Sequence, residues 1–150
     1  MLVETDAVVL HVQDYLESSR IVRLATHESG VISALARGAR RPRSRFGPAL
    51  DLFTGGVAQL AMRPGRDLQT LTGFDALRAR HALGGHLARF TAASALAELA
   101  LRFVGEVPNG GAFDALVAAL DAVGGAAPDA VAEAALAGAW HLVAELGFAP

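Results

Sequence analysis

The hydrophobic residues of this 150-residue chain change their spacing near residue 78, and this change limits the fold to a class that combines strands with helices. Before residue 78, short runs rich in Val, Ile and Leu are separated by turn-forming residues, which is typical of β-strands. After it, apolar residues recur at alternating steps of four and three, which marks one face of a helix. The sequence therefore predicts an α+β protein, with a strand domain over residues 1–78 and an all-α domain over residues 79–150.

Five segments of the first half have the composition and length of strands. They cover residues 7–12, 21–26, 31–36, 57–62 and 68–74. Residues 14–19 and 27–30 fit hairpin connections, and the sequence Arg-Pro-Gly-Arg-Asp at 63–67 is a strong turn signal. Five strands with one longer connection after the third match a small closed β-barrel of the OB type. An open meander sheet packed on the helices is the alternative.

Three helices are predicted in the second half. The second covers residues 113–123, and the third begins at Pro128 and stops at Gly147. Trp140 on the third helix is interpreted as a core residue, with a role in holding a partner peptide as the alternative. The first helix presents one apolar face, made of Leu83, Leu87, Phe90, Ser94, Ala97, Leu101 and Val104.

The most distinctive charge pattern is an arginine cluster in the sequence ARGARRPRSRFG at residues 36–47. All 13 basic residues of the chain are arginine, and residues 1–80 hold 11 of them against 8 acids, although the net charge is −2. Guanidinium groups held close together without acids create a positive potential that attracts a polyanion, and their planar fork matches phosphate. Gly38, Pro42 and Gly47 favour a loop here. The cluster consists of Arg37, Arg40, Arg41, Arg43 and Arg45.

The favoured function of the cluster is binding to a phosphate backbone. An acidic protein partner and an inert solvated loop are the alternatives. Arg20, Arg23 and Arg66 are candidates to extend the basic surface, and Arg23 is expected to point out of the barrel because Val22 and Leu24 flank it. Phe46 is a candidate to stack on a base, although a role in anchoring the loop is the stronger interpretation.

No catalytic or cofactor motif accompanies the cluster. The sequence lacks a Walker loop, a GxGxxG after a strand, HExxH and GxSxG, so we expect no enzyme activity and no cofactor. Cysteine is absent, and His141 with Glu145 is interpreted as a surface pair rather than a metal site. The N-terminus carries acids where an export signal needs basic residues, and no apolar run reaches the ~20 residues of a membrane span. A cytoplasmic location is expected.

Three motifs give the chain a resemblance to a known family. They are T-D-A-V-V-L from residue 5, D-Y-x-E-S-x-R-I-V from residue 14 and G-x-I-S-x-x-A-R-G-A-R-R-P-x-S-R-F-G from residue 30. Together with the turn at 63–67 and the ending Glu-Leu-Gly-Phe-Ala-Pro at 145–150, they resemble the RecO family of bacterial recombination mediators. The resemblance covers the whole chain and is strongest over residues 1–54.

The resemblance implies an OB-fold domain followed by a helical domain, and a nucleoid-associated role in DNA repair. It implies binding to single- and double-stranded DNA, annealing of complementary strands, and work with RecR and the single-strand binding protein to load the RecA recombinase. The family's basic surface falls on the arginine cluster. Family members usually continue beyond residue 150, many with a four-cysteine zinc module, so we expect a truncated helical domain here and carry no zinc site over.

A second function is also consistent with the residues. The chain would then be a protein-interaction module whose loop grips an acidic peptide, such as the tail of single-strand binding protein, with DNA contact incidental. Such a tail needs a basic spot and an apolar groove, and the helical half offers apolar surface. A hydrolase or nucleotidyl enzyme is a third hypothesis without a supporting motif.

Overall fold

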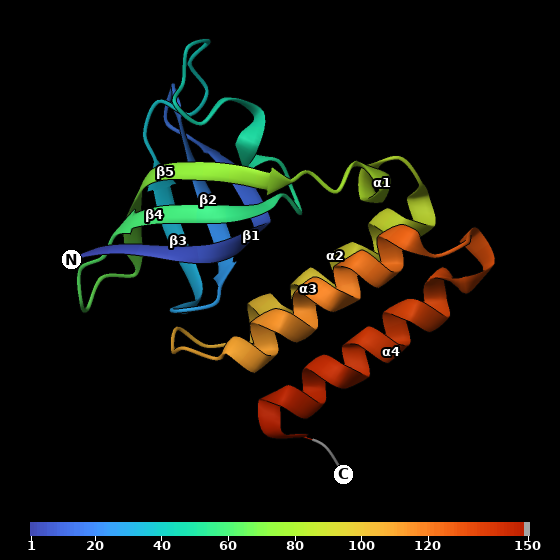
Figure 1. Ribbon diagram of the computed structural model, residues 1–150. Coiled ribbons are helices and arrows are strands. Elements are labelled where there is room, and N and C mark those ends of the chain that lie inside the picture. Colours follow the sequence, from blue (N-terminus) through green and yellow to red (C-terminus); the bar gives the residue numbers. More distant parts are fainter. Residues whose placement is uncertain (149–150) are drawn as a thin grey trace.

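The computed structural model describes residues 1–148 and places a β-barrel beside a bundle of helices (Figure 1). The strands are β1 (Leu2–Tyr15), β2 (Ser19–Thr26), β3 (Gly30–Ala36), β4 (Gly55–Ala61) and β5 (Leu68–Arg78). The helices are η1 (Gly47–Leu50), α1 (His81–Gly84), α2 (Leu87–Phe103), α3 (Gly110–Gly125), η2 (Pro128–Ala130), α4 (Val131–Val143) and η3 (Ala144–Phe148).

The five strands close into a barrel in the order β1-β2-β3-β5-β4. Neighbouring strands are antiparallel except β3 and β5, which run parallel and pair Ser33 with Leu68 and Leu35 with Thr70. The strand β1 joins both sides of the barrel, because its first half pairs with β4 and its second half with β2. The predicted OB-type barrel is therefore confirmed, and the open meander sheet is excluded.

The strand β1 is longer than the predicted segment 7–12, because the pattern covered only its middle, which is buried on both faces. Ala7 and Val9 point into the barrel, whereas Val8 and Leu10 belong to a cluster that includes helical residues. A strand covered on both sides is apolar without alternation, and only that part carries a hydrophobic signal. The same strand continues to Tyr15, so the predicted hairpin connection 14–19 shrinks to residues 16–18.

The first predicted helix is wrong in two respects. It is interrupted after Gly84, so that α1 and α2 are separate helices, and Leu87 is 80% exposed while Phe90 is 38% exposed. Leu83 and Ala97 of the predicted face are buried, and Ala93, Leu96 and Ala100 complete the buried side of α2 with Ala97. The predicted face contained Ala97 but not Ala93 or Ala100, because a pattern that gives weight to large side chains does not single out alanines.

The last helices follow the prediction more closely. Pro128 opens η2, Val131 and Leu142 are buried along α4, and Gly147 ends the helical backbone with a φ of 88°. The interpretation of Trp140 as a core residue is wrong, because its side chain is 62% exposed. Ala149 and Pro150, which end the predicted motif, lie outside the described residues. No helix within residues 1–148 is long and apolar enough to cross a bilayer.

Contacts at two places fix the barrel against the helices. The Arg80 side chain, 6% exposed, directs Nε to Asp121 Oδ1 of α3 at 2.8 Å and donates from Nη1 to the Phe53 carbonyl at 2.8 Å. Arg78 pairs with the same Asp121 carboxylate at 2.9 Å. At the start of β3, the Val31 N–H donates to the Gly105 carbonyl at 3.0 Å. These contacts hold the barrel in one orientation relative to the helices.

Candidate nucleic-acid interface

The arginine cluster lies on the loop that leaves β3 and rises above the barrel, away from the helices (Figure 1). The loop begins at Arg37 because Gly38 turns the chain with a φ of 70°, a conformation that glycine adopts without strain. Ala39 and Phe46 are buried and hold the two ends of the loop on the barrel core. The arginines between them are exposed, so the loop presents its positive charge to solvent while its two ends are fixed on the barrel.

Three of the five arginines surround one hollow. Arg37, Arg41 and Arg45 line it together with Tyr15 of β1, and its volume is about 590 Å³. Arg45 donates from Nη1 to the Thr72 carbonyl at 3.3 Å, which fixes the guanidinium without neutralising it. Within residues 1–148 none of these three arginines forms an ion pair. Their uncompensated charge favours an anion at this place.

The other two arginines of the cluster have different surroundings. Arg40 directs Nε toward the Asp14 carboxylate at 3.6 Å and donates from Nη1 to the carbonyls of Leu16 and Glu17. Its charge is therefore partly compensated, which the sequence prediction did not foresee. Arg43 is exposed and forms no ion pair with any described residue. Four arginines of the cluster thus remain without a carboxylate.

The three outlying arginines do not join the hollow. Arg20 points to the mouth of the barrel and shares Asp14 with Arg40, at a distance of 3.5 Å. Arg23 lies between the buried Val22 and Leu24 and faces outward, as predicted. It pairs with Ser33 on β3, four residues before Arg37 and so about 13 Å from it along the strand. Arg66 is exposed in the β4–β5 turn.

The aromatic residue that faces the hollow is Tyr15 rather than Phe46. Phe46 is 4% exposed and packs in the barrel core, so its ring is not available to stack on a base, and burial supports the anchoring role. Tyr15 is 37% exposed beside Arg37 and Arg41. The sequence placed Tyr15 inside a hairpin connection, and only the extension of β1 brings its ring to the arginines.

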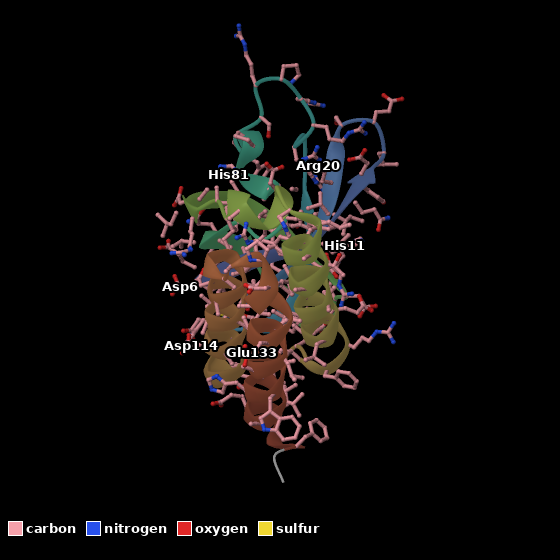
Figure 2. All side chains as sticks on the ribbon, turned by 90° about the vertical axis from the view of Figure 1, so that its right-hand side faces the viewer. Asp6, His11, Arg20, His81, Asp114 and Glu133 are labelled. Atoms are coloured by element: carbon pink, nitrogen blue, oxygen red, sulfur yellow. The ribbon has the colours of Figure 1, made fainter. Side chains whose placement is uncertain are left out.

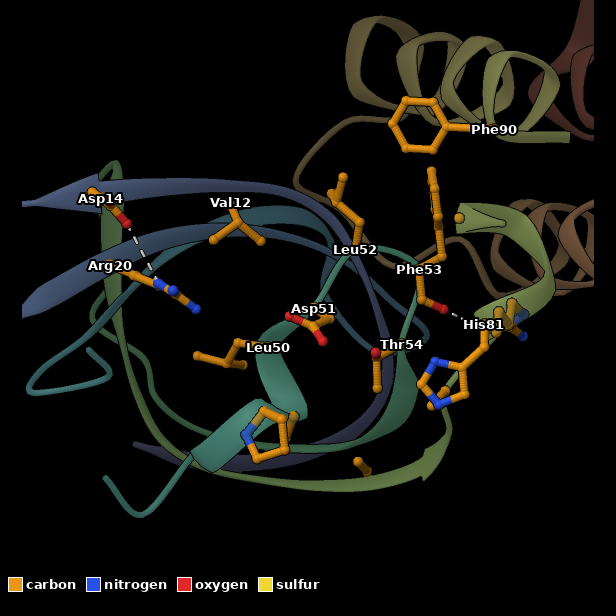
Figure 3. Close-up of a pocket in the computed structure, with 16 residues that line it drawn as sticks. Val12, Asp14, Arg20, Leu50, Asp51, Leu52, Phe53, Thr54, His81 and Phe90 are labelled. Atoms are coloured by element: carbon orange, nitrogen blue, oxygen red, sulfur yellow. Dashed lines mark hydrogen bonds and ion pairs between the residues drawn. The ribbon is translucent and has the colours of Figure 1, made fainter. Parts of the chain in front are cut away.

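A second hollow of about 750 Å³ lies at the junction of the barrel mouth and the helices (Figure 3). Arg20 and Asp14 stand at one side, while Leu52, Phe53 and Phe90 form an apolar wall at the other. Figure 2 shows Arg20 at the end of the molecule where the loop rises, far from Asp114 and Glu133 of the helices. The described lining of this hollow contains Arg20 and none of the five arginines of the cluster.

Within the described part of the chain, the histidines form no cluster that could hold a metal ion. Among residues 1–148 no three His, Asp or Glu side chains gather closely enough to hold an ion. His141 and Glu145 form an exposed pair at 3.5 Å, as the sequence predicted. His81 opens α1 and His86 precedes the first residue of α2, so the two histidines do not share a helix.

Two family profiles divide the chain between them. Residues 1–80 match "Recombination protein O N terminal", and residues 85–150 match "Recombination protein O C terminal". The chain belongs to the RecO family. This confirms the resemblance inferred from the three motifs. In the RecO fold seen here, the second motif covers the β1–β2 turn with Tyr15, and the third covers β3 and the arginine loop.

Curated RecO proteins extend the match. The "DNA repair protein RecO" of Anaeromyxobacter dehalogenans is 45% identical over 127 residues, which is 84% of this chain and 50% of the relative. The protein of the same name from Salinibacter ruber is 35% identical over 155 residues, 99% of this chain and 57% of the relative. The chain thus spans about half the length of the curated RecO relatives that it matches.

Proposed function

We propose that this chain is the DNA-binding part of a recombination mediator in DNA repair, which binds and anneals single-stranded DNA through the arginine loop. The proposal rests on the hollow that Arg37, Arg41 and Arg45 line. Their three guanidinium groups form no ion pair with a carboxylate of the described residues. The curated relatives are named DNA repair proteins, which supports the same role.

The proposed mechanism is neutralisation without covalent chemistry. Guanidinium groups bind the phosphates of a strand and release counterions, so that two like-charged strands can approach and pair. Tyr15 offers a ring on which an unstacked base can lie, a contact that tolerates any sequence. The chain would accordingly act as a binding protein and not as an enzyme.

The wider partners follow from the family and extend the proposal. RecR and the single-strand binding protein would work with this protein to load RecA, and double-stranded DNA would be a second ligand. Such a protein would be cytoplasmic and would gather at the nucleoid. The arginine loop supplies the DNA contact in this scheme, whereas the surfaces for the protein partners are not assigned to residues.

The main test is the salt dependence of DNA binding. Four unpaired arginines predict a slope of log K against log salt of about −3 for single-stranded DNA, because each phosphate contact contributes about −0.7. The double change Arg37→Ala and Arg41→Ala should flatten this slope by about 1.4. At 0.1 M salt the affinity should fall roughly 25-fold relative to the unchanged protein, equally for all base sequences. Fluorescence anisotropy with a labelled oligonucleotide measures both quantities.

Arg102→Ala is the control for the loss of positive charge. Arg102 is exposed on α2 and pairs with Glu98 at 2.6 Å, far along the chain from the loop. Its removal should leave the slope unchanged. If the double variant of the loop keeps the slope of the unchanged protein, the loop is not the docking site.

A second candidate is the protein-interaction module. It is favoured by an apolar groove of about 870 Å³ between α2 and α4, where Leu87 and Leu136 are 80% and 70% exposed. Such a groove fits the apolar end of a peptide tail. The described lining of the groove carries Asp129 and no cation, so it lacks the basic spot that the acidic residues of a tail require. For this reason DNA binding is the first proposal.

Competition between the two ligands separates these functions. A labelled oligonucleotide and a labelled acidic tail peptide are each titrated with the protein and then displaced by the other. If DNA is the ligand of the loop, Leu136→Glu should leave oligonucleotide binding within about twofold, because a single added charge on α4 is screened at the distance of the loop. Should the peptide displace the oligonucleotide and bind through the same arginines, the interaction module becomes the better account.

A further inference from the structure

Asp14 lies at the end of β1 between two arginines that belong to different parts of the chain. Its Oδ1 is 3.5 Å from Arg20 Nε of β2 and 3.6 Å from Arg40 Nε of the arginine loop. Figure 3 shows the contact with Arg20 at the border of the mouth hollow. One carboxylate therefore faces two of the cations that the basic surface would otherwise present.

Neither arginine is well satisfied by this carboxylate. Charge-assisted hydrogen bonds between nitrogen and oxygen are usually about 2.7–2.9 Å long, and both contacts are longer. The Arg20 Nε atom is shielded from solvent and has no hydrogen bond within residues 1–148. Asp14 is 61% exposed, and exposed ion pairs are weak. The pairing is consequently loose enough to be replaced by another anion.

The position of Arg40 connects this pairing to the proposed DNA site. Arg40 donates to the carbonyls of Leu16 and Glu17, and Leu16 also lines the hollow with Arg37, Arg41 and Arg45. Arg40 is thus held beside the wall of the hollow by its hydrogen bond to the Leu16 carbonyl, although it does not itself line the hollow. The phosphate group offers the same pair of acceptor oxygens as the Asp14 carboxylate.

We propose that Asp14 is an internal competitor of the DNA phosphate that limits how tightly this chain holds a strand. This inference rests on the proposed function. The tethered carboxylate competes at a high effective concentration and keeps Arg20 and Arg40 out of full phosphate contact. A protein that anneals two strands must also release the duplex, and a limited number of phosphate contacts permits release.

The change Asp14→Asn tests the proposal. The amide keeps the size of the side chain and removes the charge, so both arginines become available to phosphate. The slope of log K against log salt for single-stranded DNA should steepen by about 0.7 to 1.4, and the affinity at 0.1 M salt should rise roughly 5- to 25-fold. Anisotropy with a labelled oligonucleotide measures both, and thermal unfolding checks that the fold persists.

Glu17→Gln is the matched control, because Glu17 is an exposed acid of the same turn whose carboxylate pairs with no described residue. It changes the net charge equally and should alter the affinity by no more than about twofold. In a background with Arg20→Ala and Arg40→Ala, Asp14→Asn should also behave like Glu17→Gln, since the two arginines that Asp14 restrains are then absent.

The proposal is overturned if Asp14→Asn binds no tighter than Glu17→Gln, or if it binds more weakly because the carboxylate organises the loop. Either result leaves the proposed function intact as long as Arg37→Ala with Arg41→Ala still flattens the slope. Conversely, a flat response of that double variant removes the proposed function regardless of how Asp14→Asn behaves.

Discussion

Replacement of Gly30 by alanine is expected to lower the free energy of unfolding by at least about 3 kcal/mol. Gly30 opens β3 with a φ of 67°, where a side chain is strained by about 1–2 kcal/mol. A Cβ atom there would also overlap the carbonyl oxygens of Gly105 and Val107. The loop between α2 and α3 would have to move and would lose its hydrogen bond from Val31. Urea unfolding followed by circular dichroism measures the change.

Gly65→Ala isolates the cost of the backbone conformation. Gly65 has a φ of 79° in the β4–β5 turn, and nothing lies within 4 Å of the place a Cβ would take. Its replacement should therefore cost only about 1–2 kcal/mol. Equal losses at the two glycines would show that the close approach of the barrel to the helical loop contributes nothing to stability.

Removal of the Asp121 carboxylate is expected to cost about 3 kcal/mol. Asp121→Ala leaves Arg80 without its anion at a position where the Arg80 side chain is only 6% exposed, and it also frees Arg78. A buried cation that loses its anion keeps most of its desolvation cost, which the remaining hydrogen bond to the Phe53 carbonyl offsets only in part. The midpoint of urea unfolding should fall accordingly.

The comparison variant is Glu98→Ala, which breaks the exposed pair between Glu98 and Arg102. Exposed pairs one helical turn apart contribute about 0.3–0.5 kcal/mol, so this change should barely move the midpoint. If Asp121→Ala and Glu98→Ala lower the free energy of unfolding equally, burial of the pair between Arg80 and Asp121 does not increase its contribution to stability. A restoration of stability by Arg80→Met in the Asp121→Ala protein would identify the unpaired cation as the cause.

The barrel was predictable because its strands are short, β-branched and separated by clear turns. The segments at 21–26 and 31–36 match β2 and β3 within two residues. The ends of β1 and β5 were not predictable, since residues such as Glu4 and Asp75 are exposed and carry no hydrophobic alternation. Their strand conformation comes from pairing with β4 and, at the C-terminal end of β1, with β2, which are tertiary contacts that local sequence does not encode.

The helices illustrate the limit of periodicity. Leu87 and Phe90 recur at helical spacing, yet both are exposed, and Ala93 and Ala97 supply the buried face. Close packing of small residues also joins α3 and α4, because Gly138 of α4 approaches Ala119 of α3 so nearly that a Cβ atom at residue 138 would meet the Ala119 Cβ at 2.5 Å. Small residues permit that approach, and a sequence alone does not reveal which face needs it.

The sequence predicted the positive charge of the candidate site, but not which residues of other strands contact the arginines. Five arginines within nine residues identified the loop directly. That Asp14 compensates Arg40, and that Tyr15 joins Arg37 and Arg41, depends on how the β1–β2 hairpin folds back against the loop. Residues more than twenty positions apart meet there, and neither composition nor spacing predicts such a meeting.

The apolar cluster that extends from the barrel to the helices restricts which substitutions this sequence can accept during evolution. The family profiles divide at residues 80 and 85, but Val8, Leu10 and Val31 share one cluster with Leu116 and Leu142. A change in size of a cluster residue before residue 80 therefore requires a compensating change in a cluster residue after residue 85. The barrel and the helices therefore coevolve, and neither can be replaced by the same domain of a relative unless the other is replaced with it.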